Sequence, residues 1–367
     1  MKRISLIFLI ISAIFTSCKN GNWEFPDFDT SSVYFAYQTP VRTITLGTDY
    51  LNDNSLDNQH KCQIMATVGG FREIKNDIEI NFKVDNNLCD QLANVTAMPS
   101  NYYSLSDNKM IISKGSKMIG GVTVTLTDAF FADPKALTAN YVIPLVMTDV
   151  KNAAGILTGT PAVDNPNRFV LEDWAANATP KDYILYAVKY LNPWDVIYLR
   201  RGTDEITEDG AARTEERRGP YATPEGDEVI RLNSISMTEI AFPVSNIRAN
   251  NVNLNMTFKL TFDPATQKCT FANGAWKDSQ LVNEYTGENF RVYGIAISGS
   301  GEYVKDGAKN SWGNKDRDVL NLNYQVEYQV EQPIGSAPKT VKYVTKDVLV
   351  FRDRGVAPET FTPELKP

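Results

Sequence analysis

The segments RDVLNLNYQVEYQV (residues 317–330) and TVKYVTKDVLVFRDRG (residues 340–355) place apolar residues at every second position over most of their length. This period is typical of strands with one buried face, because successive side chains point to opposite sides of a sheet. Six further alternating segments precede them, beginning at DYILYAVKYL (182–191) and WDVIYLRRG (194–202). The pattern predicts an antiparallel β-barrel or a β-sandwich over residues 181–367, and leaves both forms open.

The preceding part of the chain is also rich in short alternating segments. They include VYFAYQTPVRTITLG (33–47), HKCQIMATVGG (60–70), IEINFKVD (78–85), KMIISKG (109–115), GGVTVTLTDAF (120–130) and YVIPLVMTDV (141–150). So many strands without a long helix predict an immunoglobulin-like β-sandwich over residues 33–150. Short helical turns are expected near 87–93 and 128–137, and Pro144 predicts an edge strand or a bulge. The fold class is therefore all-β.

Residues 151–180 separate the two strand-rich regions. They are rich in Ala, Gly, Asn and Pro and have weak periodicity, which predicts a linker between domains. Within the second region, residues 202–227 carry both signs of charge and almost no aliphatic side chains. Such a segment favours a mobile, solvated hairpin loop, with a ligand-binding flap as the alternative.

The first residues have the layout of a bacterial secretion signal. Lys2 and Arg3 precede an apolar stretch over 4–15, which is too short to span a bilayer as a helix, and small residues lead to Cys18. Residues 1–17 are therefore expected to be a signal peptide, with Cys18 acylated and 18–32 forming a lipidated tether. The alternative is an ordinary cleaved signal followed by an incidental cysteine.

Composition excludes several functions. The 367 residues carry a formal net charge of −7, without a basic stripe for nucleic acid, and hold one histidine, His60. No catalytic, nucleotide-binding or metal-binding motif is present, so we expect neither an enzyme nor a cofactor or metal. Cys62, Cys89 and Cys269 are expected to be buried and unpaired, although a bridge between Cys62 and Cys89 is possible in this compartment.

Two tryptophans have the surroundings of a saccharide site. Sugar rings pack their CH faces on aromatic rings, while amides and carboxylates bind the hydroxyls. Trp276 and Trp312 each lie in a polar segment of this kind, whereas Trp194 is expected to be core, Trp174 to lie in the linker and Trp23 in the tether. The predicted glycan-binding residues are Trp276, Trp312, Asn273, Asp278, Asn310, Asn314 and Asp316.

Short phrases in both regions resemble those of Bacteroidetes cell-surface lipoproteins. They include Val33-Tyr34-Phe35, Val68-Gly69-Gly70, Leu126-Thr127-Asp128, Tyr141-Val142-Ile143-Pro144-Leu145, Asn192-Pro193-Trp194 and Phe351-Arg352-Asp353-Arg354-Gly355. The first four resemble an N-terminal immunoglobulin-like domain long known only as a domain of unknown function. The last two resemble the C-terminal domain that often follows it. The resemblance implies a polysaccharide-utilisation setting and brings no established catalytic residues.

Together these patterns predict a lipid-anchored outer-membrane protein at the cell surface, with the periplasmic face as the alternative, that binds an oligo- or polysaccharide without catalysis. Transporter or glycosidase proteins are possible partners. The first alternative is a structural, adhesion or transporter-accessory lipoprotein without a glycan site of its own. The second is a glycoside hydrolase with an unrecognised pair of carboxylates, since 44 acidic residues always offer some pair.

Overall fold

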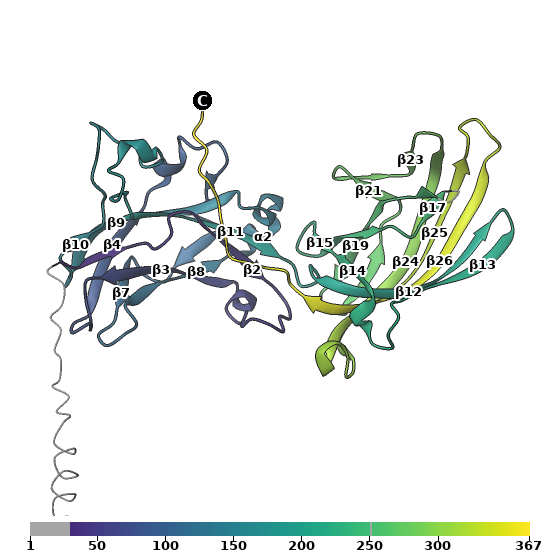
Figure 1. Ribbon diagram of the computed structural model, residues 1–367, viewed down its shortest axis with the longest axis horizontal. Helices are drawn as coiled ribbons and strands as arrows, with labels where there is room; N and C mark the ends of the chain where they lie inside the picture. Colours follow the sequence, from purple (N-terminus) through teal and green to yellow (C-terminus); the bar gives the residue numbers. More distant parts are fainter. Residues whose placement is uncertain (1–29, 250–251) are drawn as a thin grey trace, which may run out of the picture.

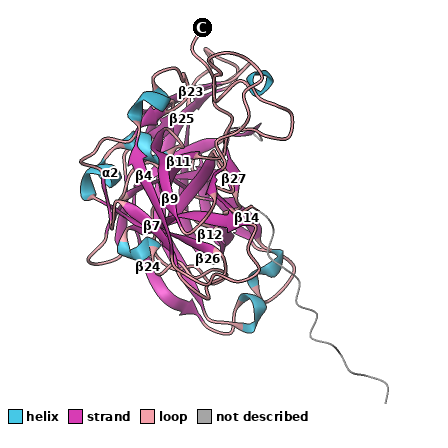
Figure 2. Cartoon of the chain, turned by 90° about the vertical axis from the view of Figure 1, so that its left-hand side faces the viewer, coloured by secondary structure: helices cyan, strands magenta, loops and turns pink. Residues whose placement is uncertain are grey.

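The computed structural model describes residues 30–249 and 252–367, so Cys18, the signal segment and most of the tether lie outside the described residues. The fold is all-β, as predicted. Two strand-rich domains lie side by side (Figure 1), and the few short helices lie mostly at the periphery of the strands (Figure 2). No helix in the described ranges is long and apolar enough to cross a membrane.

The first domain is built on one sheet with strand order β10-β1-β3-β8-β7-β4-β9-β11-β2-β27, in which β5 also pairs with β9 and β6 with β8. The strands are β1 (Ser32–Tyr34), β2 (Pro40–Thr45), β3 (Lys61–Gly69), β4 (Ile78–Val84), β5 (Thr96–Ala97), β6 (Tyr103–Leu105), β7 (Lys109–Ile112), β8 (Ile119–Leu126), β9 (Tyr141–Lys151), β10 (Gly155–Ile156), β11 (Tyr183–Leu191) and β27 (Glu359–Thr360).

This sheet folds over where β7 meets β8, at the single pair Ile111–Gly121. Ile64 and Val124 on one side and Ile80 and Ile143 on the other are fully buried in one core. A side chain at position 121 would collide with the backbone of β3, so glycine permits the close approach. The result is the two-layered β-domain expected from the alternating pattern.

The helices are single turns: η1 (Asp57–Gln59), η2 (Asn86–Cys89), α2 (Asp128–Ala132), η3 (Pro134–Leu137), η4 (Leu171–Asp173), η5 (Pro224–Gly226) and η6 (Trp312–Asn314). The turns expected near 87–93 and 128–137 are confirmed. Cys62, Cys89 and Cys269 are buried and free, so the predicted absence of a disulfide is confirmed for these three. Burial raises the pKa of Cys62 to about 12, which keeps the thiol protonated and unreactive.

Pro144 lies in β9, an interior strand of the sheet, so the expected edge strand is wrong. The pairing of β9 with β4 does shift register between Asp149 and Met147, three residues beyond the proline. The Pro144 carbonyl accepts from the Asp85 N–H at 2.9 Å, so its missing N–H would face the same side. On that side the pairing of β9 changes from β4, whose last residue lies opposite Leu145, to β5, whose last residue lies opposite Val142. The proline therefore occupies the interval where β9 lacks a strand partner on that side.

The boundary between the domains differs from the one expected at residue 181. Strand β11 belongs to the first sheet, where it pairs with β9 and β2. The expected linker over 151–180 packs on the first domain. Arg168 forms a bidentate ion pair with buried Asp182, at 2.7 and 2.9 Å, and Trp174 is buried. The chain crosses to the second domain after Leu191, and β27 returns to the first sheet (Figure 1).

The second domain is a curled sheet with strand order β13-β12-β26-β25-β24-β20-β19-β16-β15, in which β14 also pairs with β12 and β23 with β24. The strands are β12 (Ile197–Glu208), β13 (Ala211–Arg217), β14 (Glu228–Arg231), β15 (Asn233–Ser234), β16 (Glu239–Val244), β19 (Met256–Asp263), β20 (Lys268–Phe271), β23 (Glu284–Thr286), β24 (Arg291–Ala308), β25 (Arg317–Glu331) and β26 (Lys339–Asp353). Two small hairpins join β17 (Arg248–Ala249) to β18 (Val252–Asn253) and β21 (Ala275–Lys277) to β22 (Gln280–Val282).

The curled sheet is closed at one end only. Strand β14 pairs with the start of β12, and β15 pairs with β16 at the opposite margin, so residues 228–234 join the two margins. The second half of β12 pairs with β13 instead, which projects away from the closed end. The sequence left barrel and sandwich open; the structure is a curled half-barrel, whose interior contains aliphatic side chains and aromatic ones such as Phe242, Phe258 and Tyr324.

Arg354, directly after β26, joins the two domains. Its guanidinium is buried and donates to the carbonyls of Leu46 and Thr48 from the first domain and of Asn192 and Asp195 at the crossing. One side chain thereby satisfies four backbone acceptors at the junction.

Candidate functional site

The second domain contains a cavity of about 760 Å³ beside the hairpin of β21 and β22. Trp276 and Tyr285 supply aromatic surface, and both side chains are partly exposed. The polar residues of the lining include Asn255, Thr257, Asp278 and Glu284. An open cavity with two aromatic rings among hydrogen-bonding groups has the composition of a site for a polar ligand with apolar faces.

The hairpin that carries Trp276 has a local cause. Trp276 pairs with Leu281 and Lys277 with Gln280, which leaves Asp278 and Ser279 as a two-residue loop. Both loop residues have positive φ, at 48° and 65°, as in the tight turns whose twist matches that of paired strands. Asp278 is therefore held beside Trp276 at the margin of the cavity.

Neighbouring side chains hold the two rings in place. The Lys259 ammonium lies 5.5 Å from the Trp276 ring centroid and is itself ion-paired with Glu239 at 2.7 Å. Phe290 stacks on Tyr285 with a centroid distance of 6.3 Å and an interplanar angle of 15°. Rings held in this way lose little conformational freedom when a ligand packs on them.

The structure brings only part of the predicted site together. Trp276 and Asp278 line the same cavity, whereas Asn273 accepts a hydrogen bond from the Ile297 N–H at 3.0 Å and so holds the chain that leads into the hairpin. Sequence reasoning missed Tyr285 and Glu284, because β23 is a three-residue strand with little pattern of its own. The sequence pattern that could have indicated them is a tyrosine among polar residues at 283–287.

Trp312 lies elsewhere, beyond the far end of β24. The hairpin of Trp276 lies near the end of β24 that pairs with β23, whereas Trp312 follows Ala308 in the connection to β25 (Figure 1). The Arg317 guanidinium covers the Trp312 ring at 4.6 Å, and Arg317 Nε donates to the Trp312 carbonyl.

The polar residues predicted beside Trp312 are used within its own loop. Asp316 pairs with Lys309 at 2.9 Å and accepts from the Asn310 N–H, and the Asn314 N–H donates to the Ser311 carbonyl. These contacts stabilise a turn. The two tryptophans therefore cannot form one continuous saccharide surface. Trp194, expected to be core, is confirmed as buried and stacks on Phe262 at 4.1 Å.

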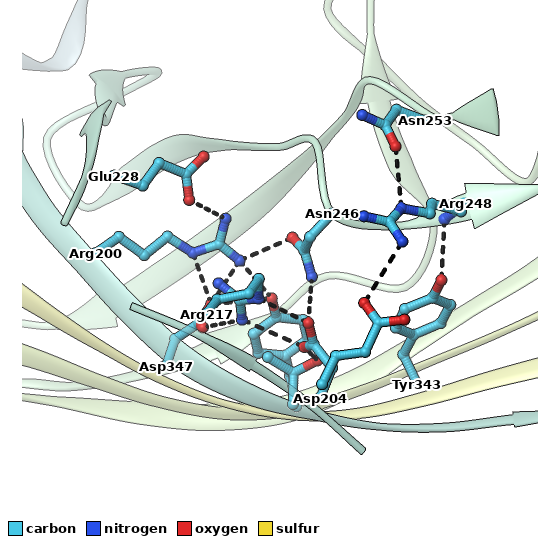
Figure 3. Close-up of polar contacts among 12 residues, drawn as sticks. Arg200, Asp204, Arg217, Glu228, Asn246, Arg248, Asn253, Tyr343 and Asp347 are labelled. Carbon is cyan, nitrogen blue, oxygen red and sulfur yellow. Dashed lines mark hydrogen bonds and ion pairs between the residues drawn. The ribbon is translucent and has the colours of Figure 1, made fainter. Parts of the chain in front are cut away.

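A second polar feature, missed by sequence reasoning, lies inside the half-barrel. Arg200 on β12 is fully buried and donates from Nε and Nη2 to Asp347 on β26, at 3.0 and 2.8 Å. Arg217 on β13 reaches the same carboxylate at 2.5 Å and Asp204 at 2.6 Å. Figure 3 shows these side chains converging from separate strands. We call Arg200, Asp204, Arg217 and Asp347 the interior charge cluster.

Neutral side chains complete the cluster. Thr345 and Asn246 donate to Asp204, at 2.7 and 3.1 Å, and the Tyr324 hydroxyl donates to Asp347 at 3.1 Å. Burial raises the pKa of Tyr324 well above its usual value, so the hydroxyl keeps the proton that it donates. Arg200 and Asp204 share the inward face of β12 with Tyr198 and Ile206. Charged residues at positions that alternate with solvent-facing ones could have indicated this cluster from the sequence.

The charged segment over 202–227 is an ordered part of the domain. It completes β12, turns at Asp209 and Gly210 and returns as β13. The loop that follows is fastened by Arg201, which pairs with Asp227 at 2.6 Å and donates to two loop carbonyls. The hairpin was expected, but Arg217 pairs with carboxylates in the interior and does not lie in solvent. The alternative of a ligand-binding flap stays a prediction.

Comparison with solved structures then places the chain. A protein of unknown function from Bacteroides ovatus is 37% identical in sequence, with a TM-score of 0.75, and the match covers 91% of this chain and 98% of that one. The chain belongs to the same family as this Bacteroides protein. Residues 193–355 match a family described as a domain of unknown function (DUF5627), and residues 28–154 match a family described as an N-terminal domain.

Two more distant structures are also similar. A second Bacteroides ovatus protein of unknown function is 14% identical over 92% of this chain and 100% of its own, with a TM-score of 0.36. An auxiliary nutrient-binding protein from Bacteroides thetaiotaomicron is 12% identical over 84% and 90%, with a TM-score of 0.33. Scores this low do not establish a shared fold. No functionally curated protein matches the sequence significantly.

Proposed function

We propose that this chain is a lipid-anchored outer-membrane protein that binds a saccharide in the cavity of Trp276 and does not transform it. The cavity itself carries the proposal: two held aromatic rings offer stacking surface, and amide, hydroxyl and carboxylate groups surround them. Membership of the same family as a Bacteroides protein supports the polysaccharide-utilisation setting that the sequence resemblance implied. Delivery of the saccharide to transporter or glycosidase proteins belongs to the same proposal.

The cavity also contains the two carboxylates that a hydrolase would need, Asp278 and Glu284. Glu284 forms an ion pair with Arg291 at 3.2 Å and is more than half exposed. The general acid of a glycosidase needs an apolar surrounding, whereas Glu284 lies in solvent beside a cation. Binding without hydrolysis is therefore the simpler function for this site.

Replacing Trp276 with alanine is expected to weaken saccharide binding about thirtyfold, the effect of removing a contact of about 2 kcal/mol. The purified wild-type chain is first screened on an array of oligosaccharides, and the strongest ligand is then titrated by calorimetry. Trp312→Ala is the matched control and should retain the affinity, because its ring packs on Arg317. Equal affinity of Trp276→Ala and wild type would contradict the proposed site.

The structural or adhesion alternative is distinguished by the same screen, since it predicts that no oligosaccharide binds. The hydrolase alternative predicts new reducing ends when the wild-type chain is incubated with its ligand. In that event Glu284→Gln should abolish their release. We expect binding and no release.

Replacing Cys18 with alanine is expected to move the chain from the membrane fraction to the soluble fraction, because acyl chains on this cysteine would be its anchor. Fractionation of expressing cells with an antibody against the chain measures this. Mass spectrometry of the wild-type N-terminus should find the lipid. Membrane retention of the variant, together with an unmodified wild-type Cys18, would refute the anchor.

A further inference from the structure

A second cavity, of about 370 Å³, opens above the interior charge cluster. It is lined by β13, by the loop between β13 and β14, and by the segment that carries Asn246 and Arg248. This places the charged 202–227 segment on one wall and the interior of the half-barrel below. The saccharide cavity of Trp276 shares no lining residue with it.

The charge of the described lining is strongly one-sided. Its guanidinium groups come from Arg200, Arg217, Arg218 and Arg248, and Glu228 is its carboxylate. The carboxylates of Asp204 and Asp347 are not part of the lining. Guanidinium groups present planar pairs of donors that match the two oxygens of a carboxylate. Arg200 and Arg217 are paired with the buried carboxylates of Asp347 and Asp204, so the exposed guanidinium groups of the lining are those of Arg218 and Arg248. These two groups give the cavity the donors to receive an anion.

The arginines at the base of the cavity are already fixed. Arg200 has no exposed side-chain surface, and the side chain of Arg217 is 18% exposed. Their bonds to Asp347 and Asp204 hold both guanidinium planes before any ligand arrives. Within the described part of the chain, the buried Nη1 of Arg217 has no hydrogen-bond acceptor. A buried donor without an acceptor is costly, and an anion entering beside it would lower that cost.

The arginines at the rim remain available to a ligand. Arg218 and Arg248 reach Glu216 and Glu215 at 3.3 and 3.5 Å, with about half of each arginine side chain exposed. Exposed ion pairs of this kind contribute little, so exchanging the glutamate for a ligand carboxylate costs little.

An exposed aromatic ring lies next to one residue of this lining. Tyr221 is 60% exposed, and its ring lies against Gly226, which lines the cavity. A Cβ on Gly226 would come within 2.8 Å of the ring, so the absence of a side chain allows this packing. An exposed ring next to a lining residue offers the apolar surface that a sugar face requires.

We propose that this arginine-lined cavity binds the carboxylate of an acidic saccharide, with the sugar ring packed on Tyr221. That the carboxylate belongs to a sugar rests on the proposed function; the preference for a carboxylate rests on the lining alone. The chain would then have two saccharide subsites in one domain, one for neutral units at Trp276 and one for uronic acid units.

The experiment compares two probes that differ at one position, methyl glucuronide with a carboxylate and methyl glucoside with a hydroxymethyl group. Calorimetric or NMR titration of the full chain should show glucuronide binding at least about tenfold tighter than glucoside. The double variant Arg218→Gln, Arg248→Gln should lose at least about tenfold of that affinity. Both positions are on the surface, so the fold should persist, which the melting temperature checks.

Two controls separate this site from its surroundings. Arg213→Gln changes an equally exposed arginine on β13 that does not line the cavity, and it should leave glucuronide binding unchanged. Trp276→Ala should also leave glucuronide binding unchanged, because the two cavities share no lining residue. A negative result at the arginine-lined cavity can therefore be told apart from a negative result at the Trp276 cavity. Tyr221→Ala should weaken glucuronide binding without affecting acetate.

Three results would overturn the proposal. Equal affinity for glucuronide and glucoside would remove the role of the carboxylate. Equal affinity for glucuronide, acetate and inorganic sulfate would show an unselective anion site without a sugar contact. Loss of affinity in Arg213→Gln as large as in the double variant would show a general effect of surface charge.

Discussion

Replacing Arg354 with alanine is expected to lower the free energy of unfolding by about 4 kcal/mol, because it removes a buried side chain and the charged donor to four carbonyls at the junction. The Asn192 carbonyl also accepts from the Asp195 N–H, so it keeps one donor. Hydrogen bonds to a charged group each contribute about 1.5–3 kcal/mol, and part of the loss is recovered when water enters. Urea denaturation followed by tryptophan fluorescence and by circular dichroism measures the change.

The matched control is Arg352→Ala, two residues earlier on the same strand. Arg352 is 39% exposed and pairs only weakly with its neighbour Asp353, so its loss should cost about 0.5 kcal/mol or less. If the two variants unfolded at the same urea concentration, Arg354 would not be the residue that holds the junction together. Arg354→Lys should be intermediate, because an ammonium has three donors for four acceptors.

Replacing Asp347 with alanine is expected to cost about 3–5 kcal/mol, since it leaves two buried or partly buried guanidinium groups without their shared acceptor. The Tyr324 hydroxyl loses its acceptor as well. The free energy of unfolding in urea measures the loss. The control is Asp353→Ala on the same strand, whose side chain is 21% exposed and whose ion pair is at the surface; its loss should cost about 0.5 kcal/mol or less.

Asp347→Asn refines this prediction. The amide preserves shape and some hydrogen bonding but supplies no negative charge to Arg200 and Arg217. A large loss of stability in this variant would show that the charge is what matters. A loss below about 1 kcal/mol in both Asp347 variants would contradict the assignment of the cluster as a tightly paired, desolvated network.

Alternation along single strands predicted the all-β class well, because the period of side-chain burial is a local property. It could not assign β11 to a domain. Tyr183–Leu191 is buried on both faces and pairs with residues 37 to 47 positions away in β9 and 146 positions away in β2, so its place in the first sheet depends on distant partners. The linker over 151–180 failed for a related reason, since its contacts are made by isolated side chains such as Arg168.

Composition alone could not separate the two tryptophan segments. Trp276 and Trp312 both lie among Asn, Asp and Lys, and the difference is made in space: Arg317 covers the ring of Trp312, whereas Trp276 faces a cavity that a later strand completes. The interior charge cluster was misjudged because mixed charge is usual at a solvated surface. Arg200 and Asp204 lie at every second position with Tyr198 and Ile206, so alternation along this strand would have assigned all four side chains to the interior face of the half-barrel.

The location of a bound saccharide can be observed directly by fluorine NMR of the chain labelled with 5-fluorotryptophan. Single Trp→Phe substitutions assign the signals of all five tryptophans, Trp23, Trp174, Trp194, Trp276 and Trp312, and the strongest oligosaccharide from the array is then titrated. The Trp276 signal should shift progressively to saturation while those of buried Trp194 and Trp174 and of Trp312 stay in place. A titration in which Trp276 does not move, or in which only Trp312 moves, would contradict saccharide binding in this cavity.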